Sequence, residues 1–335
     1  MTIPCIEITR HNPDFYNECP KALDTDVDHH AKLALVDAYG LMFPDGTDRA
    51  PILFVRHGNP DGYRFGAFSR LSDNPLGLQT PLHYEDIAQK ESTGRFRKLS
   101  DTPGIWGYGT ENPFSEYRFY EDHATWKEAD ILDVKADPFP YCVIQHQGSI
   151  AKFTEIIQPA VVTGTYEGKE ISFIGSYDKV FMPSEKQTDV GSDMAYILVL
   201  DHGIREDGRK ESVVIYISET GASMGEYYLE GEEPVSTTHV GMAIDWFHLP
   251  YVNDGTIGYK DAVFTIGNKV IHFAGKWGTK GITAQPRLSK HGQSQIFGTW
   301  YEGDTPYRHT MFTTFHENME AYDYKFSKLG YKIVD

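Results

Sequence analysis

The chain has 335 residues, enough for one large domain or two smaller ones with a substantial hydrophobic core. Its 48 acidic and 31 basic residues give a formal net charge of −17. This charge argues against nucleic acid and anionic membranes as partners, because both select basic surfaces, but it is compatible with an uncharged, apolar ligand. The 21 Tyr, 19 Phe, 31 Gly and 18 Pro residues favour many strands joined by turns over helices.

Short apolar or alternating runs recur along the chain with turn signals between them. Residues 82–91, which follow Pro81, and residues 316–321 are the candidate helical segments. Closely spaced strands without helical crossovers favour antiparallel sheets, hence a sandwich or barrel. The predicted strands cover residues 50–57, 62–69, 140–146, 158–166, 170–177, 194–201, 212–218, 237–247, 262–266, 269–274, 296–301 and 309–315.

A weak internal sequence similarity suggests that the chain contains two copies of one β unit. Gly104, Trp106 and the residues that follow resemble Gly298, Trp300 and their successors, although the spacings drift and a chance match is the alternative. The polar stretch 185–190 is the best linker candidate. We therefore predict two domains, residues 1–185 and 186–335.

The amino-terminal residues lack the basic segment and apolar core of a signal peptide, and no run approaches the roughly 18 apolar residues of a membrane span. Cys5, Cys19 and Cys142 are odd in number and lack the spacing of a metal or redox motif. These features predict a cytoplasmic protein with reduced thiols and no integral membrane segment. Strand edges allow either a monomer or a homodimer.

Two segments are the most informative. Residues 161–178 read as a strand, a tight Glu167-Gly168-Lys169 turn whose glycine accepts a positive φ, and a second strand that ends at Tyr177 and Asp178. Residues 194–202 read as an alternating apolar strand that ends at Asp201 and His202. Titratable groups at the ends of long antiparallel strands suggest a β-barrel with a ligand inside.

With these segments the chain resembles the hydroxyneurosporene synthase and carotenoid hydratase group and, more distantly, fungal Diels–Alderases. The resemblance is clearest over residues 155–205. It implies an all-β fold of two lipocalin-like antiparallel β-barrel or sandwich lobes, of the calycin-like kind. It implies that Gly175 to Phe181 forms one site strand, with Lys179 and Phe181 where the family has His and Trp. Tyr196 and Asp201 occupy the second site strand.

Asp201 and Asp178 are the predicted catalytic acid–base residues, with Tyr177 and Tyr196 orienting the substrate. Protonating or reorganising an alkene needs an acid whose pKa is raised by an apolar surround, together with aromatic faces that stabilise positive charge. The alternative is that Asp178 caps a turn and Asp201 begins a loop, which is ordinary for Asp.

Trp246 and His248 alternate onto one face of a strand and are predicted to bind substrate. The other predicted substrate-binding residues are His202, His272 and Trp277, for which a place in the core is the alternative.

Three further motifs are weaker. Gly221-Ala-Ser223-Met-Gly225 matches a hydrolase nucleophile elbow but lacks a following helix pattern. Arg56-His57-Gly58 imitates a histidine phosphatase strand, which requires an α/β fold. Asp24, Asp26 and Asp28 do not continue as a calcium loop. No metal site and no cofactor is predicted.

The sequence therefore predicts a cofactor-independent lyase or isomerase, either a hydratase or a cyclase. Its substrate would be a hydrophobic, terpenoid or polyketide-like small molecule held in an apolar β-barrel cavity. The alternatives are a non-catalytic lipid or pigment carrier and, further off, a histidine-phosphatase-like hydrolase.

Overall fold

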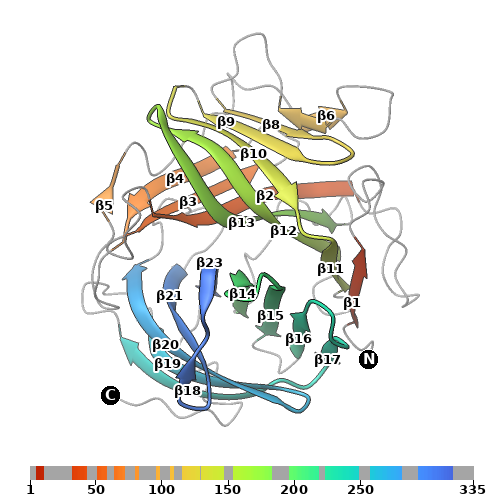
Figure 1. Ribbon diagram of the computed structural model, residues 1–335, viewed down its shortest axis with the longest axis vertical. Coiled ribbons are helices and arrows are strands. Elements are labelled where there is room, and N and C mark those ends of the chain that lie inside the picture. The colour runs from red at the N-terminus through yellow and green to blue at the C-terminus, as the bar shows by residue number, and fades with distance from the viewer. Residues whose placement is uncertain are drawn as a thin grey trace. The chain divides into compact units, whose positions relative to one another are not determined.

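The computed structural model describes fourteen stretches of the chain, and within them every regular element is a strand and the strand pairings are antiparallel. The predicted all-β class with antiparallel sheets is confirmed (Figure 1). The described residues are 5–10, 32–43, 51–58, 64–71, 80–82, 96–98, 106–108, 115–128, 130–146, 154–182, 196–218, 223–248, 257–280 and 293–319.

The chain divides into two compact units. Unit 1 comprises Met1–Phe68 and Asp86–Thr188, and unit 2 comprises Ser69–Glu85 and Asp189–Asp335. The domain boundary predicted at residues 185 and 186 stays a prediction, because it concerns which fragments fold independently.

The first sheet has thirteen strands in the order β5-β4-β3-β2-β13-β12-β10-β9-β8-β7-β6, with β11 pairing both β12 and β1. Its strands are β1 (Cys5–Arg10), β2 (Lys32–Met42), β3 (Ile52–Gly58), β4 (Arg64–Arg70), β5 (Thr80–Pro81), β6 (Phe96–Lys98), β7 (Trp106–Tyr108), β8 (Ser115–Phe119), β9 (Ala124–Glu128), β10 (Leu132–Pro138), β11 (Tyr141–His146), β12 (Thr154–Tyr166) and β13 (Lys169–Met182).

The predicted hairpin between β12 and β13 is present. Tyr166 pairs with Lys169, and the two turn residues have φ values of 51° at Glu167 and 74° at Gly168. Two successive positive φ values define the tight turn whose twist matches that of the flanking strands. β13 then runs on to Met182, so Tyr177 and Asp178 lie inside the strand and not at its end, as the sequence had suggested.

The second sheet has ten strands in the order β17-β16-β15-β14-β23-β21-β20-β19-β18, with β22 pairing β21. Its strands are β14 (Tyr196–Arg205), β15 (Lys210–Ser218), β16 (Ser223–Leu229), β17 (Val235–Thr237), β18 (Gly241–His248), β19 (Ile257–Ile266), β20 (Lys269–Lys280), β21 (Gln293–Glu302), β22 (Thr305–Pro306) and β23 (His309–Met319).

This second sheet curls so that its two ends approach each other. A Cβ on Gly225 of β16 would lie 2.7 Å from Val240 and 3.2 Å from Ile266 at the end of β19. The backbone amide of Val240, just before β18, donates a 2.9 Å hydrogen bond to Ser223 Oγ on β16. Only a small residue at position 225 lets the two ends come this close.

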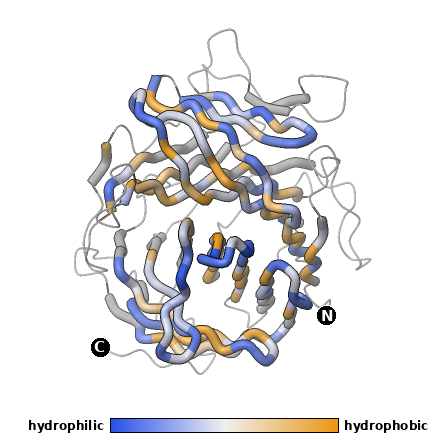
Figure 2. The backbone as a smooth tube through the Cα atoms, in the orientation of Figure 1, coloured by the Kyte–Doolittle hydropathy of each residue, from blue (hydrophilic) through white to orange (hydrophobic). Residues whose placement is uncertain are grey.

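The interior of unit 2 is an apolar cluster contributed by seven strands. Hydrophobic and hydrophilic residues alternate along several of these strands (Figure 2), as expected where one face of a strand packs inward. We call this set the unit 2 cluster: Ile197, Val199, Val213, Ile215, Ile217, Tyr227, Leu229, Val240, Ile244, Ala262, Phe264, Ile266, Ile271, Phe273, Ile296 and Trp300.

One predicted helical segment is wrong, one is not tested, and one predicted strand is longer than expected. The helical turn expected at residues 316–321 is wrong over its described part, because residues 316–319 belong to β23. The helix expected at residues 82–91 lies almost wholly outside the described residues. β14 extends to Arg205, so Asp201 and His202 lie within the strand and do not begin a loop.

Candidate functional site

Asp201 lies on the inward face of β14. Its neighbour two residues earlier, Val199, and its cross-strand partner on β15, Val213, both belong to the unit 2 cluster. Side chains two apart on a strand, and directly opposite residues on the next strand, share a face. The Asp201 carboxyl group is therefore set into the edge of an apolar interior, and the residue is only 3% exposed.

The surroundings of Asp201 favour its protonated form. Burial raises its pKa to about 7, and the negative charge of Glu211 adds to the rise, whereas the electrostatic interaction with His309 and a hydrogen bond from Thr314 oppose it. Thr314 Oγ1 donates to Asp201 Oδ1 over 2.8 Å. A carboxyl group that titrates near pH 7 is suited to donate and accept protons at physiological pH.

Glu211 lies on the same face of the sheet as Asp201 and contacts a second set of polar side chains. It is 2% exposed, and its cross-strand partner on β14 is Gly203, two residues after Asp201. Tyr227 Oη donates to Glu211 Oε1 over 2.7 Å, and His309 Nε2 lies 2.8 Å from Glu211 Oε2. Burial raises the pKa of Glu211, but the hydrogen bonds from His309 and Tyr227 outweigh it and leave the pKa below its ordinary value.

A glycine makes room for the His309 ring. A Cβ on Gly203 would lie 2.5 Å from His309 Cδ2, closer than real Cβ atoms approach a neighbour. The ladder between β14 and β23 has an irregularity at Ile204 and Arg205, beside this position. Gly203 thus lets the imidazole lie against the β14 backbone, where it reaches Glu211.

Arg205 and Tyr307 complete the polar end of the unit 2 interior. Arg205 Nη1 lies 3.3 Å from Glu211 Oε1, and the Arg205 guanidinium lies over the Tyr307 ring at 5.7 Å from its centroid. Burial, aided by the charge of Glu211, raises the pKa of Tyr307 and keeps its hydroxyl protonated. We call Asp201, Arg205, Glu211, Tyr227, Tyr307, His309 and Thr314 the polar cluster.

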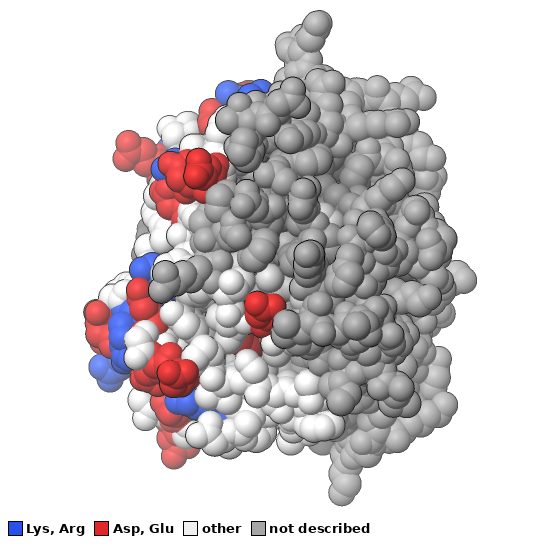
Figure 3. Space-filling view, turned by 90° about the vertical axis from the view of Figure 1, so that its right-hand side faces the viewer, with Lys and Arg blue, Asp and Glu red and all other residues white. Residues whose placement is uncertain are grey.

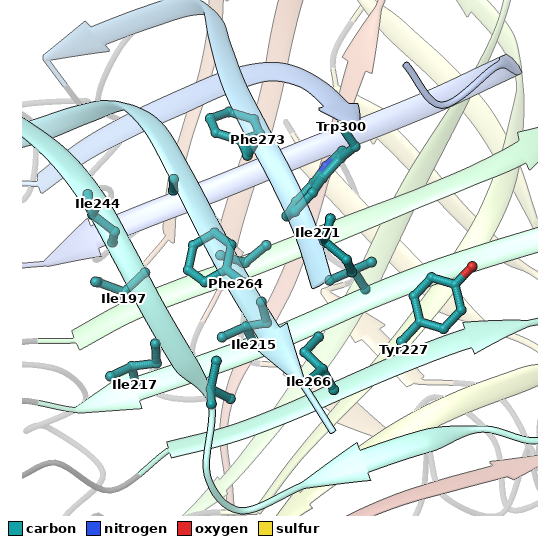
Figure 4. Packing of buried hydrophobic residues seen from close by; sticks show 14 of the residues in the cluster. Ile197, Ile215, Ile217, Tyr227, Ile244, Phe264, Ile266, Ile271, Phe273 and Trp300 are labelled. Atoms are coloured by element: carbon teal, nitrogen blue, oxygen red, sulfur yellow. The ribbon is translucent and has the colours of Figure 1, made fainter. Parts of the chain in front are cut away.

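The polar cluster adjoins the apolar one. Tyr227 belongs to both, and Tyr307 packs against the unit 2 cluster. In Figure 4, Tyr227 lies to one side of the isoleucines and its hydroxyl points away from them. Phe264 and Phe273 lie 6.1 Å and 5.3 Å from Trp300, centroid to centroid, and supply aromatic surface within the same interior.

His202 faces the other way, although it follows Asp201 directly. It is fully buried, its Nδ1 lies 2.8 Å from Ser212 Oγ, and burial lowers its pKa to about 3. Alternation on β14 separates the imidazole from the Asp201 carboxyl group. The structure therefore does not bring these two predicted site residues together, and the substrate-binding role of His202 stays a prediction.

Asp178 and Tyr177 lie in unit 1, on opposite faces of β13. Asp178 is 3% exposed and accepts a hydrogen bond from Ser176 Oγ. Tyr177 is 1% exposed and its ring lies 5.5 Å from that of Phe119 and 5.8 Å from that of Trp126. Asp178 and Asp201 thus belong to different compact units, and their catalytic roles stay predictions.

Four other predicted site residues have side chains outside the described set: Tyr196, Trp246, His248 and Trp277. Their backbones lie in β14, β18 and β20, with a register irregularity before Trp246 and another before Trp277. His272 is described: it lies between buried Ile271 and Phe273, is half-buried, and its Nε2 is 2.7 Å from Asp261 Oδ2. Their binding roles stay predictions.

Two of the competing motifs lack the fold they require. Ser223, the centre of the elbow-like motif, begins strand β16 and its Oγ accepts a hydrogen bond from the Val240 amide. A nucleophile elbow needs a sharp turn into a helix instead. Arg56 and His57 lie in β3, which pairs antiparallel with β2. The residues Asp24, Asp26 and Asp28 lie outside the described part of the chain.

The described side chains form no group of three or more His, Cys, Asp and Glu residues placed to bind a metal ion. Among the same residues, no helix is long and apolar enough to cross a membrane. The absence of a cofactor from the reaction stays a prediction.

Sequence reasoning missed Glu211, Tyr227 and His309. Glu211 immediately precedes the predicted strand 212–218, and Tyr227 follows the elbow-like motif, so neither stood out as a buried polar residue. His309 lies 98 residues from Glu211 in the chain. The available signal was the alternation of β15, which places Glu211 on the same face as Val213, Ile215 and Ile217.

Comparisons with known proteins give distant structural similarity alone. No protein-family model and no curated protein matches the sequence. The structure is similar to that of a protein assigned as AttH from Nitrosomonas europaea, with 13% identity over 90% of this chain and 98% of that chain and a TM-score of 0.48. It is also similar to kievitone hydratase from Nectria haematococca, with 11% identity over 86% of this chain and 90% of that chain and a TM-score of 0.43. Identities and TM-scores this low assign neither a family nor an activity to this chain.

Proposed function

We propose that the protein is a cofactor-independent lyase or isomerase, of the hydratase or cyclase kind, that acts on a hydrophobic substrate through Asp201. The observation that carries the proposal is a buried carboxyl group, with a pKa raised to about 7, at the boundary between the polar cluster and an apolar interior. The terpenoid or polyketide-like class of the substrate belongs to the proposal and rests on the sequence resemblance.

The polar cluster supports a proton-transfer cycle. In the resting state Asp201 carries a proton, while Thr314 donates to its Oδ1 and leaves Oδ2 to hold that proton. Transfer of the proton to an alkene carbon leaves a carboxylate and a substrate cation. His309, whose electrostatic interaction with Asp201 favours the ionised carboxylate, stabilises the first of these charges. The aromatic faces of Trp300 and Phe273 are suited to stabilise the second.

The cycle closes in one of two ways. In a hydration, water adds to the cation and its released proton returns to Asp201, so that alkene and water give an alcohol. In an isomerisation or cyclisation, the cation loses a proton from another carbon to the same carboxylate. Both routes return Asp201 to its protonated form and need no oxidant or reductant.

Deuterium transfer to carbon tests both routes at once. Organic extracts of the purified protein identify any co-purifying small molecule by mass spectrometry, and that molecule and a panel of polyenes are then incubated with the enzyme in D2O. We expect time-dependent deuterium incorporation at carbon with the wild type and a loss of at least about 100-fold in Asp201→Asn.

A matched control uses Asp137→Asn, which removes a half-exposed carboxylate that contacts Lys135 in unit 1. This variant should keep the wild-type rate. If the wild type binds an apolar molecule tightly but neither it nor the variants incorporate deuterium at carbon, the non-catalytic carrier is favoured and the proposal is contradicted.

A further inference from the structure

The two ends of the second sheet meet without a backbone ladder between them. Within the described strands, the order of this sheet begins at β17 and ends at β18, and these two strands do not pair with each other. By contrast, β15 and β16 pair over seven consecutive residues. We call the line where the two ends meet the seam. Its residues are Ser223, Gly225, Tyr227 and Val235 on one side and Val240, Ile266, Gly267 and Lys269 on the other.

Side-chain contacts hold the seam together. The Val240 amide donates a 2.9 Å hydrogen bond to Ser223 Oγ, and Lys269 Nζ lies 4.7 Å from the centroid of the Tyr227 ring. The other contacts across the seam are apolar and involve the two glycines. Local opening of a protein begins where backbone hydrogen bonds are few, because less free energy is needed there. The seam is therefore the part of unit 2 where opening should begin.

Tyr227 joins the seam to the polar cluster. Its ring lies beneath Lys269, and its hydroxyl donates to Glu211 Oε1 over 2.7 Å. Tyr227 of β16, Val213 of β15 and Asp201 of β14 are directly opposite one another. Because neighbouring strands lie about 4.8 Å apart, the seam at Tyr227 is about 10 Å from Asp201.

The interior of unit 2 is packed when the seam is closed. Asp201 is 3% exposed, and the members of the unit 2 cluster are at most 8% exposed. A substrate of the function proposed above therefore reaches Asp201 only if part of unit 2 moves. Entry past Arg205 would require an apolar molecule to displace a charged pair, because Arg205 Nη1 lies 3.3 Å from Glu211 Oε1. The seam presents more apolar surface and avoids this cost.

We propose that the seam is a gate, in which β16 and β17 move away from Val240 and Ile266 and admit a hydrophobic molecule to the interior of unit 2. Opening separates the packed side chains and so creates the room for this molecule. The identity of the molecule rests on the function proposed for Asp201, whereas the opening of the seam does not.

A reversible disulfide across the seam tests the gate. In Gly225→Cys/Val240→Cys the two Cβ atoms lie at most about 4.2 Å apart, a separation that a disulfide spans. The probe is N-phenyl-1-naphthylamine, a neutral hydrophobic fluorophore, which is mixed with the full-length protein in a stopped-flow instrument. We expect uptake of the probe to be at least about tenfold slower when the disulfide is formed, and to recover after reduction.

Two controls isolate the effect of the disulfide. Val240→Cys alone and the wild type pass through the same oxidation and reduction, and both should take up the probe at a rate that does not change. Equal rates in the oxidised and reduced double variant, or no uptake of the probe by the wild type, would overturn the gate. Gated uptake by a wild type that shows no deuterium transfer would contradict only the function proposed for Asp201.

The Ser223 hydroxyl gives a second test that needs no disulfide. Ser223→Ala removes the group that accepts the hydrogen bond from the Val240 amide, and exposed Ser236→Ala on β17 is the matched control. We expect uptake of the same probe to be at least about threefold faster in Ser223→Ala and unchanged in Ser236→Ala. The same uptake rate in both variants would count against a gate at the seam.

Discussion

Asp201 and His202 are adjacent in the chain, and burial shifts both toward their uncharged forms. The pKa of Asp201 rises to about 7 and that of His202 falls to about 3. The two shifts act on stability in opposite directions, because the folded state holds an extra proton at Asp201 and lacks one at His202. At the scale of the residue, function and stability therefore compete at Asp201.

Replacement of Asp201 by Asn should stabilise the protein at high pH. The folded pKa of about 7 lies above the ordinary value of 3.8, so the wild type loses stability as the pH rises between these values. Asn does not ionise, so the variant avoids this loss. Above pH 7 its unfolding free energy should exceed that of the wild type by on the order of 4 kcal/mol. Urea unfolding from pH 4 to pH 8 measures it, with exposed Asp130→Asn as control. If the difference in unfolding free energy between Asp201→Asn and the wild type stayed constant across this pH range, the raised pKa of Asp201 would be contradicted.

Replacement of His202 by Asn should act in the opposite sense. Its folded pKa of about 3 lies below the ordinary 6.5, so the wild type loses stability as the pH falls from 6.5 toward 3. His202→Asn removes this loss, which is on the order of 4–5 kcal/mol at the lower limit. The same unfolding series should show a shallower acid slope than in wild type or in exposed His239→Asn. An unchanged slope would count against a buried neutral imidazole.

The close approach of Gly203 and His309 predicts a coupled pair of substitutions. Gly203→Ala places a methyl group 2.5 Å from His309 Cδ2 in the present arrangement. The displaced ring should cost about 1–3 kcal/mol of unfolding free energy and slow deuterium transfer. In a His309→Ala background the same substitution should cost much less, because the ring is gone. Equal costs in both backgrounds would show that the two residues do not interact.

At the scale of the element, the conformation of the turn residues explains the position of the β12–β13 hairpin better than the strand propensities of its residues do. The two-residue turn between β12 and β13 uses Glu167 and Gly168 at positive φ, and the flanking strands pair along their whole length from Tyr166 and Lys169. The alternation and the glycine make this hairpin visible in the sequence. The bulges in β18 and β20 are not visible there, because they depend on the neighbouring strands.

Two glycines in and beside β12 should respond differently to alanine. At Gly164, with φ +152°, a Cβ would lie 2.2 Å from the Asp133 carbonyl oxygen, whereas at Gly168, with φ +74°, it would meet nothing within 4 Å. Gly164→Ala should cost more than about 3 kcal/mol, because the backbone of β10 must shift. Gly168→Ala should cost only about 1 kcal/mol of backbone strain. Urea unfolding of the two variants measures this difference. Similar losses of unfolding free energy in both would contradict the steric argument.

At the scale of the whole molecule, acidic side chains dominate the surface charge. Figure 3 shows Asp and Glu side chains interspersed with fewer Lys and Arg side chains on the described part of one face. Some of the partly exposed charges of the described residues are paired: Arg209 contacts Asp207 at 2.9 Å and Glu232 at 3.1 Å. Exposed pairs of this kind contribute little to stability, so the formal net charge of −17 leaves a repulsion among the acidic groups.

Salt should therefore stabilise the molecule. Raising NaCl from about 10 mM to about 0.3 M shortens the screening length and weakens repulsion between exposed carboxylates. We expect the midpoint of thermal unfolding to rise across this range at pH 7.5, and to rise less at pH 5, where the net charge is smaller. A midpoint that falls with salt would mean that surface ion pairs outweigh the repulsion.

The sequence by itself determined the fold class and many of the strands. Alternation and turn residues are local properties, and they placed strands such as 170–177 and 212–218 within the longer β13 and β15. It also singled out Asp201 as the candidate acid, from a carboxylate that follows an apolar strand.

Only the tertiary structure decided which groups surround that acid. Thr314 is 113 residues from Asp201, and His309 is 98 residues from Glu211, so no local pattern links them. The direction of each side chain is likewise decided by the structure. Asp201 and His202, both predicted site residues, lie on opposite faces because the strand continues through both residues. Local sequence specifies strands and turns, whereas the burial that shifts a pKa depends on every strand packed around the group.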